Sequence, residues 1–324
     1  MYSWIERRLR RGYEQLLHRE IGDGPAHVAI IMDGNRRYAR KQGQNAPDGH
    51  REGAQTSEQV LQWCEELWID ELTLYAFSTE NFNRPRDEQE PLFDIIESKL
   101  YELADSDRVH RNEVSLRAIG ELDRLPERVQ NAISYAERQT GEYDAFRLNV
   151  ALAYGGRNEL LRAAREVTAS VERGELSVDD IDVSTVEGHL YRQPLRDVDL
   201  IIRTGGDERT SNFLPWHANG NEAAVYFCAP YWPEFSKVDF LRGIRTYESR
   251  EQSWQQSKVE RSLALIRTLG SVELTEAKRV AGRLADQLPR SAVDRLDDEL
   301  AKQQPDARDH STSVAEPAAN DPAD

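Results

Sequence analysis

The feature that most constrains the fold of this chain is a regular alternation of short apolar runs with segments of helical spacing. The runs are apolar on both faces, which is typical of strands buried in a covered parallel sheet. Strand–helix–strand alternation implies right-handed crossovers, with helices on both faces of the sheet. The sequence therefore predicts one α/β domain with a six-stranded, mainly parallel sheet flanked by helices. Its strands are predicted at Val28–Met32, Leu72–Phe77, Val114–Ile119, Leu148–Ala153, Leu200–Ile202 and Ala223–Cys228.

Two of the segments between these runs have apolar residues at the spacing of an amphipathic helix. The first stripe consists of Val60, Leu61, Cys64, Leu67 and Trp68. The second consists of Leu92, Ile95, Ile96, Leu100 and Leu103.

The ends of the chain differ in composition from its centre. The predicted organisation is an N-terminal amphipathic helix (1–22), a catalytic domain (23–250), a C-terminal helical extension (251–302) and a disordered acidic tail (303–324). In the first of these segments, arginines surround a face formed by Ile5, Leu9, Tyr13 and Leu16. Such a helix either lies on an anionic membrane surface or packs on its own domain.

Charge and cysteine content exclude several classes of protein. The 58 acidic and 42 basic residues give a net charge of −16, which opposes a dedicated nucleic-acid binder. No apolar run could span a bilayer, no signal peptide precedes the domain, and two cysteines support no disulfide framework, so we expect a cytoplasmic protein. Of the basic residues 36 are Arg and 6 are Lys. With the acidic excess, this bias indicates a halophilic, high-salt cytoplasm, although a GC-rich genome alone would explain the arginines.

Gly, Asn, Ser and Arg gather directly after four of the six runs. Parallel strands end at one edge of a sheet, so Arg37, Arg84, Arg203 and Arg209 would converge there. Guanidinium groups bind phosphate in a bidentate manner, and this many of them suit two phosphate-bearing substrates. Asp33 would either bind a Mg²⁺ that bridges phosphates or cap the next helix.

Several other phosphate-binding and hydrolytic sites are excluded by spacing. The chain has no G-x-x-x-x-G-K-[ST], no G-x-G-x-x-G after the first run and no G-x-S-x-G. Its seven histidines include no pair at metal-ligand spacing.

At these same loops the sequence resembles the cis-prenyltransferases, the undecaprenyl and dehydrodolichyl diphosphate synthases, with features closest to the archaeal and eukaryotic branch. The resemblance covers about residues 25–245, in family order. The matching segments are Met32–Ala39, Gly49-His50-x-x-Gly53, Leu72–Pro85, Tyr154–Arg157, Ile202–Gly206, Arg209-x-Ser211-Asn212-Phe213-Leu214-x-Trp216 and Tyr231–Phe235.

The resemblance implies successive condensation of isopentenyl diphosphate, in cis, onto an allylic diphosphate. It assigns Asp33 to Mg²⁺, His50 to the departing diphosphate and Asn81 to proton abstraction. The allylic diphosphate would contact Gly34, Asn35, Arg36, Arg37, His50 and Arg84; isopentenyl diphosphate would contact Arg203, Arg209, Thr210 and Ser211; and Tyr38, Ser78, Thr79, Glu80 and Phe82 would complete the substrate site.

Two positions depart from the bacterial form of the family. Ala46 stands where an Arg is expected, and Ala224 where a second metal-site Glu is expected; Glu222 would replace the latter if the strand end is irregular. These changes keep open the alternative of a non-catalytic partner subunit in a heteromeric enzyme.

The resemblance also implies partners for the chain. The archaeal form of the family favours geranylgeranyl diphosphate as the primer, with farnesyl diphosphate as the alternative. The product would be a long-chain polyprenyl diphosphate that carries glycans. An apolar tunnel for this product would lie between the sheet and the two predicted helices that carry the apolar stripes. The alternative is that the residues of these stripes only pack in the core. Family members are dimers, so a homodimer is expected, with contacts around Tyr226–Phe235. Because this product is strongly hydrophobic, peripheral contact with a membrane is also expected.

Overall fold

The computed structural model describes residues 12–22, 24–191, 194–219 and 223–268, of which 254–268 are described as backbone only. The chain divides into two compact units, residues 1–250 and 251–324. The first contains the whole sheet. The expected 303–324 tail lies outside the described residues, as do most of the 251–302 extension and residues 1–11 of the N-terminal segment.

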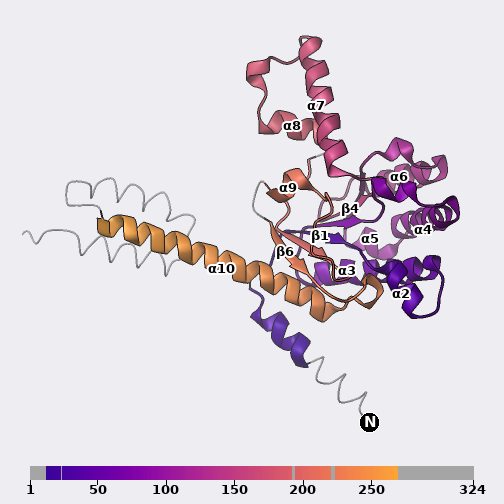
Figure 1. Ribbon diagram of the computed structural model, residues 1–324, viewed down its shortest axis with the longest axis horizontal. Helices are drawn as coiled ribbons and strands as arrows, with labels where there is room; N and C mark the ends of the chain where they lie inside the picture. Colours follow the sequence, from indigo (N-terminus) through magenta and orange to yellow (C-terminus); the bar gives the residue numbers. More distant parts are fainter. Residues whose placement is uncertain (1–11, 23, 192–193, 220–222, 269–324) are drawn as a thin grey trace, which may run out of the picture. The chain divides into compact units, whose positions relative to one another are not determined.

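All six predicted strands form, and they make one wholly parallel sheet, which confirms the predicted fold class (Figure 1). The strand order is β3-β4-β2-β1-β5-β6. The strands are β1 (His27–Ile31), β2 (Glu71–Tyr75), β3 (Val114–Ile119), β4 (Phe146–Ala151), β5 (Leu200–Arg203) and β6 (Ala224–Phe227).

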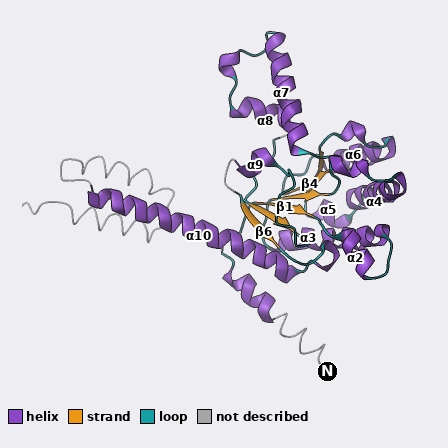
Figure 2. Cartoon of the chain, in the orientation of Figure 1, coloured by secondary structure: helices purple, strands orange, loops and turns teal. Residues whose placement is uncertain are grey.

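Helices surround the sheet (Figure 2). They are α2 (Asn35–Lys41), α3 (Ala46–Glu66), α4 (Arg86–Ala104), α5 (Asp107–Arg111), α6 (Glu127–Thr140), α7 (Gly156–Glu172), α8 (Val183–Leu190), α9 (Pro215–Asn219) and α10 (Lys237–Thr268). Short 3₁₀ turns lie at Thr79–Asn83, Leu122–Arg124, Val178–Asp180 and Trp232–Glu234. No helix among the described residues is long and apolar enough to cross a membrane.

The two faces of the sheet support separate apolar cores because neighbouring strand residues point to opposite faces. Val28 and Ile30 of β1 pack in the larger core, with side chains from α3, α4, α6 and α10. Ala29 and Ile31 pack in the smaller core, with Phe213 and Leu214 near α9. Burial on both faces explains why the strands read as continuous apolar runs.

The order of the strands places the ends of β1 and β5 at a switch point. From β1 the chain first builds β2, β3 and β4 on one side, and it then adds β5 and β6 on the other. In doubly wound sheets the crevice beyond the carboxyl ends of such strands is where ligands bind. Ile31 of β1 pairs with Arg203 of β5, so the residues following Ile31 lie beside Arg203.

The described part of the N-terminal helix, residues 12–20, packs on its own unit. Leu17 is buried against Val238 and Leu241 of α10. Tyr13 and Leu16 from the predicted apolar face are exposed. Of the two alternatives for this helix, the structure therefore shows packing for its described residues.

One residue of the apolar stripe predicted for α3, Trp68, does not pack in the core. Trp68 is 90% exposed, because α3 ends at Glu66 and Trp68 adopts a left-handed backbone conformation with φ of 56°. Trp63 is buried instead, and its ring packs against Phe235 and Phe240.

Close packing of α3 on the start of α2 makes Gly49 a sensitive position. A Cβ at Gly49 would overlap the backbone oxygen of Asn35 and lie 3.0 Å from Cβ of Ala39. We expect Gly49→Ala to lower the free energy of unfolding by about 1–3 kcal/mol, although Ala favours a helix. Chemical denaturation in high-salt buffer measures this effect. The matched control is Gly188→Ala on α8, where a Cβ meets nothing within 4 Å; an equal loss of stability in both variants would contradict the packing argument.

Candidate active site

A buried arginine joins the ends of β1 and β5. Arg203 is the last residue of β5 and is only 3% exposed, and its Nη2 lies 2.7 Å from Oδ2 of Asp33. Asp33 follows β1 by two residues, and its backbone N–H and C=O both hydrogen-bond to the Thr204 hydroxyl. The two strand ends are thus joined through both side-chain and backbone contacts.

The same guanidinium orders the loop after β5. Nη1 of Arg203 donates hydrogen bonds to the carbonyl oxygen of Arg209 and to the Ser211 hydroxyl. Nη2 also lies 3.2 Å from Asp207 Oδ2. Ser211 and Asn212 both have positive φ angles, of 49° and 59°. This strained stretch of backbone is held in place by contacts to a residue of the core.

Asp33 is charged at neutral pH. Burial alone would raise the pKa of its carboxyl group, but the hydrogen bond from Arg203 and the charges of Arg37 and Arg203 outweigh it and hold the pKa below its ordinary value. Arg37 lies one helical turn further along the chain, with its Nη2 3.1 Å from Asp33 Oδ1. Asp33 therefore presents a carboxylate held between two guanidinium groups.

The turn between β1 and α2 requires glycine. Gly34 has φ of 104°, and a Cβ there would lie 2.7 Å from the Tyr231 ring. An L side chain would meet both the backbone penalty and this clash. The turn exposes the first N–H groups of α2, which like those of any helix start have no partner within the helix.

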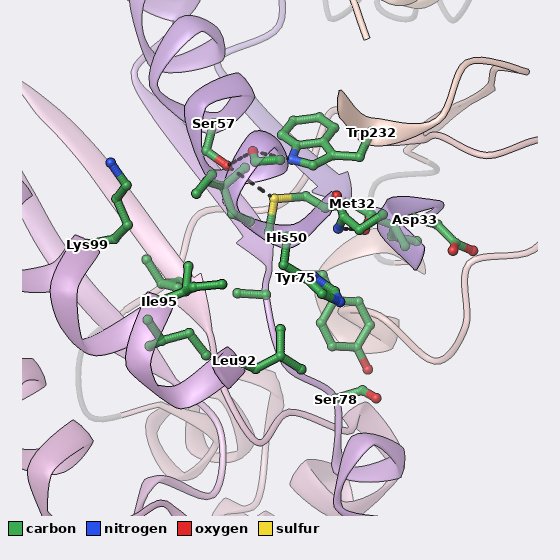
Figure 3. Close-up of a pocket in the computed structure, with 18 of the residues that line it drawn as sticks. Met32, Asp33, His50, Ser57, Tyr75, Ser78, Leu92, Ile95, Lys99 and Trp232 are labelled. Carbon is green, nitrogen blue, oxygen red and sulfur yellow. Dashed lines mark hydrogen bonds between the residues drawn. The ribbon is translucent and has the colours of Figure 1, made fainter. Parts of the chain in front are cut away.

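Next to these groups a cavity of about 410 Å³ opens at the edge of the sheet and runs between the sheet, α3 and α4. Its apolar walls include Leu61, Leu74, Leu92, Ile95, Ile96, Leu100, Leu103, Leu148 and Val150. In Figure 3, Lys99, Ile95 and Leu92 lie on one side of the cavity, with Asp33 and Ser78 on the other. The cavity therefore has a polar mouth and an apolar body.

The structure brings many of the predicted site residues together at this mouth. Those that line the cavity are Asp33, Asn35, His50, Ser78, Glu80, Asn81, Arg84, Arg203, Arg209 and Ser211.

Gly34, Arg36, Arg37, Tyr38, Thr79, Phe82 and Thr210 do not line the cavity. Tyr38 donates a hydrogen bond to Glu52 at 2.6 Å, and Arg36 lies 3.4 Å from Glu88. The Phe82 ring packs against Phe77. Several of these residues therefore support neighbouring elements of the site.

Asn81 holds the turn after β2. Its Oδ1 accepts a hydrogen bond from the backbone N–H of Ser78 at 2.9 Å, and its own N–H donates to the Ser78 carbonyl at 3.0 Å. The turn places Ser78, Glu80 and Asn81 on one wall of the cavity. The carbonyl oxygen of the Asn81 side chain is thus already engaged.

His50 is neutral at physiological pH. Its pKa is lowered to about 4 by burial and by the positive charges of Arg84 and Arg36. The imidazole lines the cavity together with Arg84. An anionic ligand that neutralised the charges of Arg84 and Arg36 would therefore raise the pKa of His50.

Sequence reasoning missed several residues of the cavity. Ser57 and Trp232 line the cavity, and Ser57 Oγ contacts Met32 Sδ at 3.4 Å (Figure 3). Lys99 and Glu58 form an ion pair of 2.5 Å between α4 and α3 in the wall. The motif Tyr231–Phe235 was a signal for Trp232, but nothing in the sequence pairs Lys99 with Glu58.

The described residues do not test the second metal ligand predicted from the sequence. Glu222 lies outside the described residues. Ala224 is buried and pairs with Leu200, three residues before Arg203, and so lies roughly 10 Å from the carboxyl edge of the sheet. Asp207 is the other carboxylate that contacts Arg203 at this edge.

Comparisons with known proteins agree with this geometry. The protein family described as "Putative undecaprenyl diphosphate synthase" matches residues 31–255. A tritrans,polycis-undecaprenyl-diphosphate synthase (geranylgeranyl-diphosphate specific) of Halobacterium salinarum is 64% identical over 277 residues, which cover 86% of this chain and 91% of that protein. A protein of the same name from Haloarcula marismortui is 62% identical, with the same shares covered.

Solved structures of similar proteins have the same fold. Lavandulyl diphosphate synthase from Lavandula x intermedia, in complex with dimethylallyl diphosphate, has a TM-score of 0.64 and 37% identity, over 69% of this chain and 95% of that one. A "probable undecaprenyl diphosphate synthase" from Campylobacter jejuni has a TM-score of 0.57 and 33% identity, over 70% and 96% of the two chains.

The lowered pKa of His50 gives a direct test of anion binding at the mouth. We expect inorganic pyrophosphate to raise the pKa of His50, because the bound anion offsets the charges of Arg84 and Arg36. NMR titration of the imidazole resonances measures the change. His110, which hydrogen-bonds Tyr143 away from the cavity, is the control. A His50 pKa that stays near 4 while pyrophosphate demonstrably binds would place the anion elsewhere.

Proposed function

Since the chain belongs to the undecaprenyl diphosphate synthase family of cis-prenyltransferases, we propose that it extends geranylgeranyl diphosphate with isopentenyl diphosphate units in cis, giving a long-chain polyprenyl diphosphate that carries glycans. In each cycle a carbon–carbon bond forms between the two substrates. Diphosphate leaves the allylic substrate with its bonding electrons, and the isopentenyl unit loses a proton.

The single observation that carries this proposal is the continuity of the mouth with the apolar cavity. Arg84, Arg203 and Arg209 line the same space as Leu92, Ile96 and Leu100. A substrate with a diphosphate head and a hydrocarbon tail matches both parts. The cavity lies where an apolar tunnel was expected, and all residues of the predicted Leu92–Leu103 stripe line it.

The allylic diphosphate fits the side of the mouth formed by α2 and α3. The first N–H groups of α2 can donate to phosphate oxygens. Arg84 and His50 line the cavity beside these N–H groups. Arg37, which contacts Asp33, adds positive charge to the same side of the mouth. Fixed donors aimed at the leaving diphosphate lower the barrier, because negative charge collects there as the bond breaks.

Isopentenyl diphosphate fits the loop after β5. Arg209 is 69% exposed and lines the mouth, so its guanidinium is accessible to a phosphate. Arg203 is buried and already bonded to Asp33 and Ser211. Arg203 therefore positions the loop and adds charge, while Arg209 and Ser211 make the direct contacts.

The mouth suits Mg²⁺, which commonly binds one or two carboxylates together with substrate phosphates and water. Asp33 is a charged, partly exposed carboxylate at the mouth and would hold the ion. Bound there, Mg²⁺ would neutralise charge on the leaving diphosphate. The arginines around Asp33 fix the orientation of its carboxylate.

The turn at Thr79–Asn83 is proposed to form the region of proton removal. The Asn81 side chain positions this turn through Ser78. Glu80 places a carboxylate on the same wall of the cavity, where it can accept or relay a proton.

The experiment that tests the function combines purified protein, Mg²⁺, labelled isopentenyl diphosphate and either geranylgeranyl or farnesyl diphosphate in high-salt buffer. We expect a ladder of long polyprenyl products with geranylgeranyl diphosphate. A ladder with farnesyl diphosphate alone would overturn the choice of primer. Folded protein that yields no extractable product with either primer would overturn catalysis and favour the alternative of a partner subunit.

Asp33→Asn tests the proposed metal ligand, because Asn keeps the shape of the side chain and removes its charge. We expect kcat to fall by about 100-fold or more. Asp207→Asn is the matched control: Asp207 also contacts Arg203 Nη2 but does not line the cavity, and its loss should affect kcat far less. Equal losses in the two variants would show that Asp33 acts only through the arginine.

Arg209→Gln tests the second diphosphate subsite. Losing one guanidinium–phosphate contact of about 1.5–3 kcal/mol should raise the KM for isopentenyl diphosphate by about 10- to 100-fold. The KM for the primer should change less. Arg157→Gln is the control, since its exposed side chain lies outside the cavity. If the KM for the primer rises more, the two subsites are exchanged.

Two further expectations, a homodimer and peripheral contact with a membrane, stay predictions. A dimer would be seen by analytical ultracentrifugation in high salt, and membrane contact by co-sedimentation with anionic vesicles.

A further inference from the structure

Three potential metal ligands converge at the side of the smaller core, on the face of the sheet opposite the cavity. Glu187 belongs to α8, Asp197 precedes β5 and His217 belongs to α9. One carboxylate oxygen of each acid and one ring nitrogen of His217 all lie within 4.8 Å of one another. Segments from three separate parts of the chain therefore bring N and O donors to one point.

His217 is a buried residue with unsatisfied hydrogen-bonding capacity. The residue is only 2% exposed, and its Nδ1 has no hydrogen-bond partner among the described residues. Leaving such a buried nitrogen unpaired costs about 1–3 kcal/mol. The imidazole packs against the Tyr191 ring, with centroids 5.1 Å apart, and the backbone carbonyl of His217 accepts a hydrogen bond from the Val198 N–H.

A neighbouring aromatic side chain orients one of the two carboxylates. Trp216 Nε1 donates a hydrogen bond to Glu187 Oε1 at 3.1 Å, which orients that carboxylate.

We propose that Glu187, Asp197 and His217 bind one divalent transition-metal ion of the Zn²⁺ class, separate from the Mg²⁺ expected at Asp33. One imidazole and two carboxylates suit Zn²⁺, with water completing the coordination. The imidazole nitrogen disfavours Mg²⁺ and Ca²⁺, which prefer oxygen ligands.

The ion would have a structural role. It would join α8 and α9 to the segment that enters β5. Since α9 begins at Pro215, directly after the loop that carries Arg209 and Ser211, the ion would fix the far end of that loop. The inference does not depend on the proposed reaction, because metal binding and unfolding report on it without substrate.

The test uses tag-free, full-length protein freed of metal with EDTA. Asp33→Asn serves as the background, so that metal bound at the mouth does not contribute. Calorimetric titration with Zn²⁺ should show one site in this background, and Zn²⁺ should raise its thermal unfolding midpoint. Adding His217→Gln or Glu187→Gln should weaken Zn²⁺ binding by at least about 10- to 100-fold and abolish the shift in midpoint.

The control variant is His110→Gln, which removes a histidine away from the cluster and should leave Zn²⁺ binding unchanged. Co²⁺ substituted for Zn²⁺ should give visible absorption that the His217→Gln variant lacks. If His217→Gln fails to fold, Glu187→Gln on the partly exposed rim carries the test. The proposal is overturned if the Asp33→Asn protein binds no Zn²⁺, or if both added substitutions leave its affinity unchanged.

Discussion

The active-site edge depends on the ion pair between Arg203 and Asp33. A guanidinium that is 3% exposed has lost most of its hydration, and it is stable there because carboxylates and a carbonyl surround it. The pair joins β1 to β5 at the switch point and fixes the loop to Ser211. The arrangement of the loops after β1 and β5, which are proposed to contact the substrates, is therefore coupled to the core of the sheet.

A parallel sheet with both faces covered separates the charged and apolar parts of the reaction. Strand ends gather polar loops at one edge, while the space beneath α3 and α4 is lined mainly by apolar side chains. In a protein of net charge −16, arginines at the mouth create a local positive site for diphosphates. For diphosphate binding, the local placement of positive charge therefore matters more than the net charge of the protein.

Much of this arrangement could be predicted from the sequence, because it follows from local patterns. Apolar runs located the strands, and Gly and Arg after them located the mouth. The error arose where tertiary packing decides. Trp68 has helical spacing but follows the end of α3, so its side chain is exposed. Glu187 and His217 lie 30 positions apart on different helices, so no spacing rule relates them.

We propose that the hydrocarbon chain grows into the cavity behind the charged mouth. The most direct measurement compares the length of products from the wild-type protein and from Leu100→Trp, which fills the cavity between α4 and the sheet. The control is Leu161→Trp, on an exposed position of α7. Leu100→Trp alone should give shorter products, with the first condensation still occurring. Products of unchanged length from a folded, active Leu100→Trp protein would contradict this proposal.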